Sequence, residues 1–255
     1  MLRNEWYTLS GIVNLQSKTK PDYPAAANYF RKYAEEILKP EWLNHETRSA
    51  EDDSVIQGYQ LTKLAKCIKN FLRKIKADTT LLEELEQFLP SLLHPLSHHD
   101  LASPIYKGEL NEIQSCLAKL TDFMVEVESK CKMVLPPRLL KLTFELSATN
   151  HGYYEIQTNE PLYLTDNGGV KTLSDCHCTA KTCYRISGVS RVKGKNFKAD
   201  DATSNYTSVE DAYEKIYAFI HGQPDYSHVP KAGDYKTEFI YADEGTWKPF
   251  QDLTA

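Results

Sequence analysis

Residues 107–147, KGELNEIQSCLAKLTDFMVEVESKCKMVLPPRLLKLTFELS, contain the point at which the hydrophobic period of the chain changes from helical to strand-like. Over residues 107–132 apolar side chains recur every three or four positions, which predicts an amphipathic helix. Pro136 and Pro137 end that pattern, because proline lacks the amide hydrogen that a helix interior needs. Over residues 139–146 apolar and polar side chains alternate, which predicts a strand. We therefore expect a helical region up to residue 135 and a β-rich region after it.

The region before this boundary has the pattern of a helical bundle. A helix is predicted over 25–38, with prolines before its start and Pro40 at its end. Two further helices are predicted over 55–77 and 80–89, and the first of these has Lys and Arg opposite its apolar face. With the helix over 107–132, these elements predict an up-down four-helix bundle over residues 1–135.

The region after the boundary has short strands and one helix. Asp166-Asn167-Gly168-Gly169 is a tight-turn signal between two strands. A helix is predicted over 206–222, because Thr207 and Ser208 can cap its start and Gly222 its end. The predicted strands cover residues 139–146, 153–158, 162–165, 170–173 and 178–192. The fold class expected is therefore α+β, with an antiparallel β-rich domain over 136–222 and an irregular, acidic, Tyr-rich tail over 223–255.

Composition places the chain among folded proteins, with 41% hydrophobic and 25% charged residues in 255. No run of 18 apolar residues occurs, so no membrane-spanning helix and no membrane partner are expected. The first residues lack the basic and apolar segments of a secretory signal, which favours a cytoplasmic location.

Charge is unevenly distributed along the chain. The net charge is −4 over residues 1–129 (15 Lys and Arg against 19 Asp and Glu), +5 over 130–195 (10 against 5) and −6 over 196–255 (5 against 11). The basic middle segment is a candidate surface for RNA phosphates, and a solvated strand face is the alternative. The candidate RNA-binding residues are Lys181, Arg185, Arg191, Lys193 and Lys195.

Three of the six cysteines cluster as Cys176, Cys178 and Cys183, with His177 between the first two. A structural zinc site normally has two closely spaced ligand pairs, and no second pair follows here. We therefore expect no bound metal and no cofactor, with zinc kept as the alternative. The other cysteines fall singly in helical patterns, which predicts buried free thiols.

Two further groups of residues are chemically notable. Arg31 and Glu35 are four positions apart and so share one helix face, an arrangement that a surface ion pair also explains. The stretch HPLSHHD, residues 94–100, holds three histidines just before the last predicted helix of the bundle. Capping and solvent exposure are the alternatives to a catalytic role for these histidines.

An R-x3-E motif on the first helix, with a histidine at the entry to the last helix after a proline turn, resembles the HEPN ribonuclease family. The nearest resemblance is to the anticodon-nuclease branch of that family, and it covers residues 21–132. It implies that the bundle is HEPN-like and that Arg31, Glu35 and His98 are catalytic. His99 is the alternative to His98 as the catalytic histidine. The resemblance also implies a homodimer and a place in a bacterial anti-phage defence complex with an ABC-type or SMC-type ATPase subunit.

The implied activity is metal-independent cleavage of tRNA or other RNA. The 2′-hydroxyl of RNA attacks the adjacent phosphate, histidine and a carboxylate move protons, and arginine stabilises the phosphorane charge. The sequence departs from the family in lacking the R-x4-6-H motif, and it holds no G-x4-G-K-[ST] motif of an ATPase. The second hypothesis is therefore a non-catalytic interaction or dimerisation subunit that docks on the ATPase.

Overall fold

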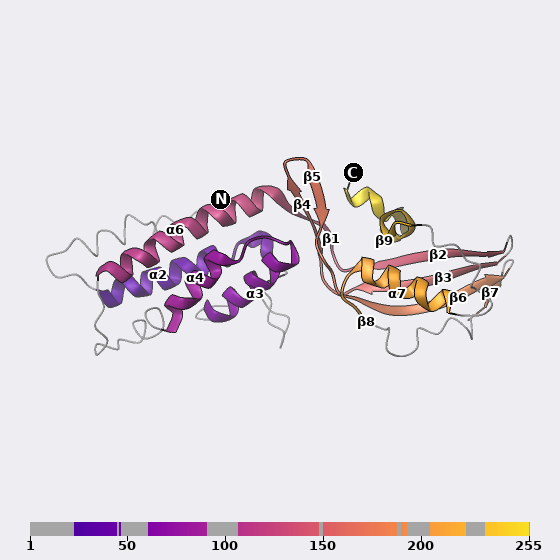
Figure 1. The fold of residues 1–255 in the computed structure, drawn as a ribbon, viewed down its shortest axis with the longest axis horizontal. Helices are drawn as coiled ribbons and strands as arrows, with labels where there is room; N and C mark the ends of the chain where they lie inside the picture. The colour runs from indigo at the N-terminus through magenta and orange to yellow at the C-terminus, as the bar shows by residue number, and fades with distance from the viewer. Residues whose placement is uncertain are drawn as a thin grey trace. The chain divides into compact units, whose positions relative to one another are not determined.

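The computed structural model describes residues 23–44, 46, 61–90, 107–147, 150–187, 190–192, 205–222 and 233–254 (Figure 1). The chain divides into two compact units, Met1–Lys130 and Cys131–Ala255, and each is described by itself. The first unit is helical, and the second contains two antiparallel sheets with helices.

The helical unit contains elements of very different length. They are α2 (Tyr23–Ile37), the 3-10 helix η2 (Glu41–Leu43), α3 (Leu61–Lys74), α4 (Thr80–Phe88) and α6 (Lys107–Lys130). Helix α6 lies beside α2 and also packs on α4, whereas α3 packs on α2 and α4 (Figure 1). The Tyr33 hydroxyl lies 3.0 Å from Thr121 Oγ1 and links α2 to α6.

The predicted HEPN-like four-helix bundle is wrong. Helix α4 has nine residues and α6 has 24, which correspond to about 13 Å and about 36 Å of axis, so α4 accompanies only part of α6. Helix α3 has its main contacts with α2 and α4 rather than with α6. Hydrophobic periodicity identifies the buried face of each helix but not the direction of its axis, and this is why the pattern misled us about the arrangement.

The helix that precedes the prolines is shorter than the sequence pattern indicates. Helix α6 ends at Lys130, and strand β1 (Cys131–Leu135) follows without a loop. Strand β1 pairs with β4 (Leu162–Asn167), which in turn pairs with β5 (Val170–Leu173), to form a three-stranded sheet. Pairing with β4, which is distant in sequence, therefore determines where α6 ends. The β4–β5 hairpin turns through Gly168 and Gly169, whose φ angles of 67° and 93° favour glycine.

The larger sheet of the second unit has seven strands. Its order is β10-β9-β2-β3-β6-β7, and β8 pairs with β6. The strands are β2 (Leu139–Ser147), β3 (Asn150–Thr158), β6 (Cys178–Ser187), β7 (Ser190–Val192), β8 (Asn205–Tyr206), β9 (Ile240–Asp243) and β10 (Thr246–Pro249). All of their pairings are antiparallel.

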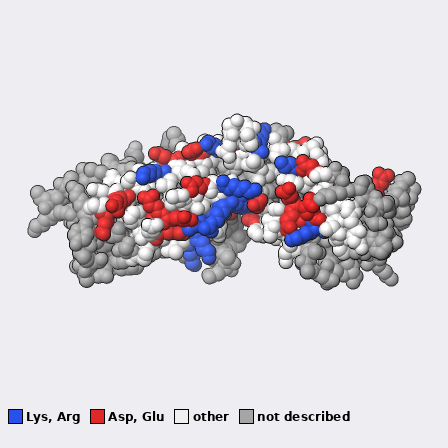
Figure 2. All heavy atoms as spheres, in the orientation of Figure 1, with Lys and Arg blue, Asp and Glu red and all other residues white. Residues whose placement is uncertain are grey.

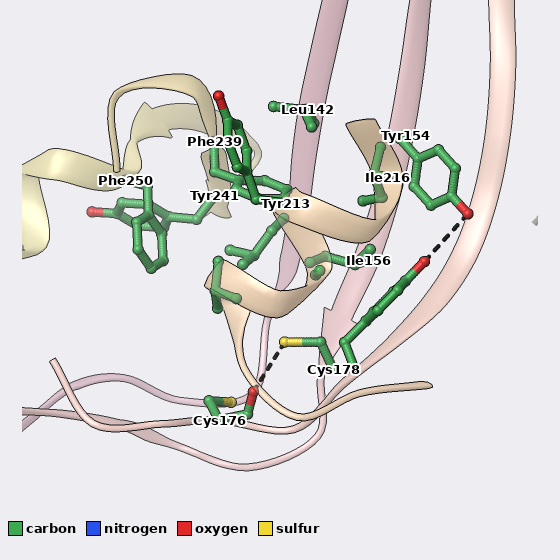
Figure 3. Close-up of a cluster of buried hydrophobic side chains, with 14 of the residues drawn as sticks. Leu142, Tyr154, Ile156, Cys176, Cys178, Tyr213, Ile216, Phe239, Tyr241 and Phe250 are labelled. Carbon is green, nitrogen blue, oxygen red and sulfur yellow. Dashed lines mark hydrogen bonds between the residues drawn. The ribbon is translucent and has the colours of Figure 1, made fainter. Parts of the chain in front are cut away.

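One face of this sheet is packed against α7 (Val209–His221). Alternate residues of β2 and β3 meet the apolar side of α7 in a buried cluster (Figure 3). Phe144 and Tyr217 pack edge to face with ring centroids 5.3 Å apart. Ser208 caps α7, because its hydroxyl accepts a hydrogen bond of 3.0 Å from the Asp211 amide.

The chain after residue 232 differs from the irregular tail that we expected. It forms α8 (Tyr235–Glu238), β9, β10 and the 3-10 helix η5 (Phe250–Thr254). Strand β9 pairs with β2 through Leu140 and Tyr241. Phe239, Tyr241 and Phe250 all enter the core beside α7 (Figure 3).

None of the helices in the described part combines length with enough apolar character to cross a lipid bilayer.

The packing of α7 on the sheet predicts a large effect of truncating Ile216, which is 1% exposed. We expect Ile216→Ala to lower the free energy of unfolding of the second unit by about 2–4 kcal/mol, since a buried cavity replaces the lost methyl groups. Urea unfolding followed by circular dichroism measures the change. Glu214→Ala, on the exposed side of the same helix, is the control and should change stability by less than about 0.5 kcal/mol. Equal effects of the two variants would contradict this packing.

Candidate functional site

Helix α2 holds Arg31 and Glu35 on the face that it turns toward the core. Arg31 lies among buried apolar residues of the same face and is only 4% exposed. Its apolar neighbours on that face are Ala26, Ala27, Phe30, Ala34, Ile37 and Leu38. Arg31 is therefore buried and Glu35 is partly buried, which differs from the fully exposed ion pair that the i, i+4 spacing also allowed.

The two charged groups are in contact. Arg31 Nε lies 3.4 Å from Glu35 Oε1, and the side chains are 5% and 14% exposed. Burial raises the pKa of Glu35 above its ordinary value, and the charge and hydrogen bonding of Arg31 counteract part of that increase. A carboxyl group with a raised pKa holds its proton closer to neutral pH than an exposed glutamate does. The arrangement thus offers a proton carrier beside a fixed cation.

The histidines of the predicted catalytic set lie outside the described residues. His98 and His99 fall between α4 and α6, so the structure tests neither their distance from Arg31 nor which of them would approach Glu35. Arg31 and Glu35 are the two members of the set that the structure brings together.

Only some of the predicted RNA-binding residues fall in the described part of the chain. Lys181 is exposed on β6. Strands β6 and β7 pair so that Arg185 is opposite Val192 and Arg191 is opposite Ile186. The two arginines therefore belong to neighbouring residue pairs of these strands. Lys193 and Lys195 lie outside the described residues.

The cysteine cluster is divided by burial. Cys176 and Cys178 are each 1% exposed within the core beside α7 (Figure 3), where Cys178 Sγ donates a hydrogen bond of 3.2 Å to the Cys176 carbonyl. His177, between them, is exposed and contacts the Glu160 carboxylate. Among the residues described, no three His, Cys, Asp or Glu side chains come together as a metal site. The side chain of Cys183 is not among those described.

Three of the described cysteines have thiols whose pKa is raised. Hydrogen bonding to Cys176, followed by burial, raises the pKa of Cys178. Burial raises the pKa of Cys116 to about 11 and also raises that of Cys67. Because the thiolate is both the nucleophile and the metal ligand, these three positions are poorly suited to either role.

The sheet of the second unit holds a stacked cation that was not predicted from the sequence. Lys141 Nζ lies 3.9 Å from the ring centroid of Trp247 and 5.5 Å from that of Tyr153. These residues come from β2, β10 and β3, and Trp247 is 40% exposed. Lys141 lies between the buried Leu140 and Leu142 on β2, so it is on the opposite face of the strand. No local signal indicated that β10 would bring Trp247 to the same face.

Comparisons of the chain with protein-family models, with curated proteins and with solved structures found no match. The interpretation of the site therefore depends on its own geometry and on the sequence motifs.

The buried pair predicts a strongly non-additive mutant cycle. We expect Arg31→Leu to lower the free energy of unfolding by about 3 kcal/mol, because it leaves the Glu35 carboxylate without its counter-charge. We expect Arg31→Leu/Glu35→Leu to recover part of that loss, since the double variant contains neither charge. Urea unfolding near neutral pH measures all four proteins of the cycle. Additive effects of the single changes would show that the two groups are not coupled.

The raised pKa of Glu35 predicts how stability changes with pH. The folded chain keeps this proton at pH values where the unfolded chain, with the ordinary value of 4.5, has lost it. The contribution of the protonated carboxyl is therefore complete below the unfolded pKa and is lost as the pH rises through the folded pKa. In Glu35→Gln, which resembles the protonated form, this loss should be absent. Unfolding free energies measured from acidic to neutral pH should thus decline more in the wild type, and parallel curves would contradict the pKa shift.

Proposed function

We propose that this chain is an effector or accessory subunit of a bacterial anti-phage defence complex, and that it acts as a metal-independent endoribonuclease on tRNA or other RNA. The observation that supports catalysis is the contact between Arg31 and Glu35, in surroundings that raise the pKa of the carboxyl group. The second support is the resemblance of residues 21–132 to anticodon nucleases. This resemblance rests on the R-x3-E motif and on the histidine before the last helix, and it does not depend on a four-helix bundle.

The chemistry needs two proton transfers and one stabilised charge. A base removes the proton of the RNA 2′-hydroxyl as its oxygen attacks the adjacent phosphorus, and an acid protonates the departing 5′-oxygen. Glu35 can serve in one of these transfers because its proton is retained toward neutral pH. His98 or His99 would serve in the other. Arg31 offers the guanidinium that stabilises the extra negative charge on the phosphorane oxygens. The products are a 2′,3′-cyclic phosphate and a 5′-hydroxyl.

A second candidate function is a non-catalytic subunit that dimerises or docks on an ABC-type or SMC-type ATPase. The 4% exposure of Arg31 favours this alternative, because a guanidinium so enclosed has little surface with which to contact an RNA phosphate. The homodimer, the ATPase partner and the cytoplasmic location belong to the proposal in both forms.

Cleavage of total tRNA in EDTA tests the catalytic form. The protein is assayed alone and after co-expression with the products of its neighbouring genes, and the ends of the fragments are analysed. We expect Glu35→Gln and Arg31→Lys each to reduce cleavage by about 100-fold or more, because one removes a proton carrier and the other a fixed fork of donors. Glu36→Gln, an exposed position on the same helix, should cleave as the wild type does.

Circular dichroism must show that both variants are folded before their activity is compared. Wild-type cleavage by both variants would remove Arg31 and Glu35 from the active site. A lack of cleavage by the wild type, even with its neighbours present, would leave the docking subunit as the function.

A further inference from the structure

Helix α3 has an unusual charge composition for a helix in an acidic part of the chain. The 14 residues Leu61–Lys74 include five Lys or Arg and no Asp or Glu, and Lys76 adds another cation in the turn that follows. The apolar residues of α3 are each at most 1% exposed and form its core side. These residues are Leu61, Leu64, Ala65, Ile68, Phe71 and Leu72.

The cations of α3 are of two kinds. Lys69 contacts Glu83 and Glu86 of α4, and Lys74 contacts Glu46, so these charges are neutralised within the unit. Lys63, Lys66 and Arg73 are exposed, and none of them has an ion pair with another residue of the described part.

The unneutralised cations form a line along the helix. The three cations lie on the side of the helix opposite its apolar residues, together with one polar residue, Asn70. At 100° per residue, an arc of roughly 80° contains all four: Lys63, Lys66, Asn70 and Arg73. Consecutive members are three or four residues apart, so each step advances roughly 5 Å along the axis. We name these four residues the α3 basic face. Figure 2 shows Lys and Arg gathered where α3 lies in Figure 1, next to the acidic side chains of the neighbouring helix.

This arrangement is unfavourable for the isolated unit. Lys63 and Lys66 are three residues apart, and Arg73 follows about two turns after Lys66, so like charges lie along one side of the helix. No carboxylate of α3 itself separates them. A polyanion laid along the α3 basic face would relieve this repulsion, and it would release its own counterions on binding.

The chemistry of α3 favours RNA over a lipid surface. A basic helix that binds a membrane inserts its apolar side between the lipids. The apolar side of α3 is already occupied by the core of its own unit, so no apolar anchor is available. A row of cations with one polar amide matches a chain of phosphates, because neighbouring phosphates of one strand can each meet a donor.

We infer that the α3 basic face binds the phosphate backbone of the RNA substrate. The choice of RNA as the polyanion rests on the proposed function, and the binding site itself rests on the charge pattern of α3. This assignment differs from the basic segment 130–195 that the sequence favoured for RNA, and the two locations can be separated by mutation.

The test measures RNA binding by the full chain without cleavage. The probe is a short fluorescent RNA with 2′-O-methyl groups, which cannot be cut through its own 2′-oxygen, and fluorescence anisotropy is recorded over a salt series. The variant Lys63→Gln/Lys66→Gln/Arg73→Gln removes the three cations. Lys119→Gln/Lys215→Gln/Lys248→Gln makes the same change in charge at exposed positions outside both α3 and the segment 130–195, and it is the control.

We expect the α3 triple variant to bind about tenfold or more weakly than the wild type. We also expect the slope of log affinity against log salt to fall by about 2, because each phosphate contact with a single strand contributes about 0.7. The control variant should keep wild-type affinity and slope. The α3 variant should keep its thermal stability, since it loses only exposed like charges.

Four results would overturn the inference. The first is that the α3 variant binds the probe as the wild type does, and the second is that the control variant is weakened as much as the α3 variant. The third is that Lys181→Gln loses binding while the α3 variant keeps it. The fourth is that the wild type binds phosphatidylserine vesicles more tightly than it binds the probe. Binding through α3 in a chain that cuts no tRNA would support this inference while rejecting the nuclease. If the α3 variant cleaves tRNA and binds the probe as the wild type does, the nuclease would be supported and the inference about α3 rejected.

Discussion

A guanidinium cannot be retained in an apolar interior without an opposite charge, and Arg31 meets this constraint through Glu35. The consequences reach beyond the two side chains. The carboxyl must be buried deeply enough to approach the arginine, and that burial raises its pKa. The face of α2 that packs into the helical unit therefore carries its most polar contact within its apolar stripe. A buried pair of this kind is compatible with catalysis and with purely structural use, and its chemical reactivity depends on access to the carboxyl.

Local elements could be predicted from the sequence where the signals were local. Tyr23–Ile37, Thr80–Phe88 and Val170–Leu173 lie within two residues of the predicted helices and strand, because prolines, capping residues and glycines mark their ends. The arrangement could not be predicted in the same way. Strand β1 exists because β4 pairs with it, and β9 exists because β2 offers an open edge. Such pairings join residues far apart in sequence, and no periodicity encodes them.

The candidate site shows the same division. The spacing of Arg31 and Glu35 correctly placed both on one helix face, but spacing does not distinguish a buried face from an exposed one when both residues are charged. The flanking apolar residues Phe30, Ala34 and Leu38 contained that information, since Arg31 borders their buried stripe. The stack of Lys141 on Trp247 needed the register of three strands, which became known only with the sheet.

The edge strand β10 has a consequence for how this protein associates with itself. Its four residues Thr246–Pro249 are exposed, and they include a lysine and a proline. Both residue types discourage a second copy from adding a strand, because proline offers no amide hydrogen and charge opposes close approach of edges. At this edge the sheet is protected against growth into a continuous, aggregating ribbon.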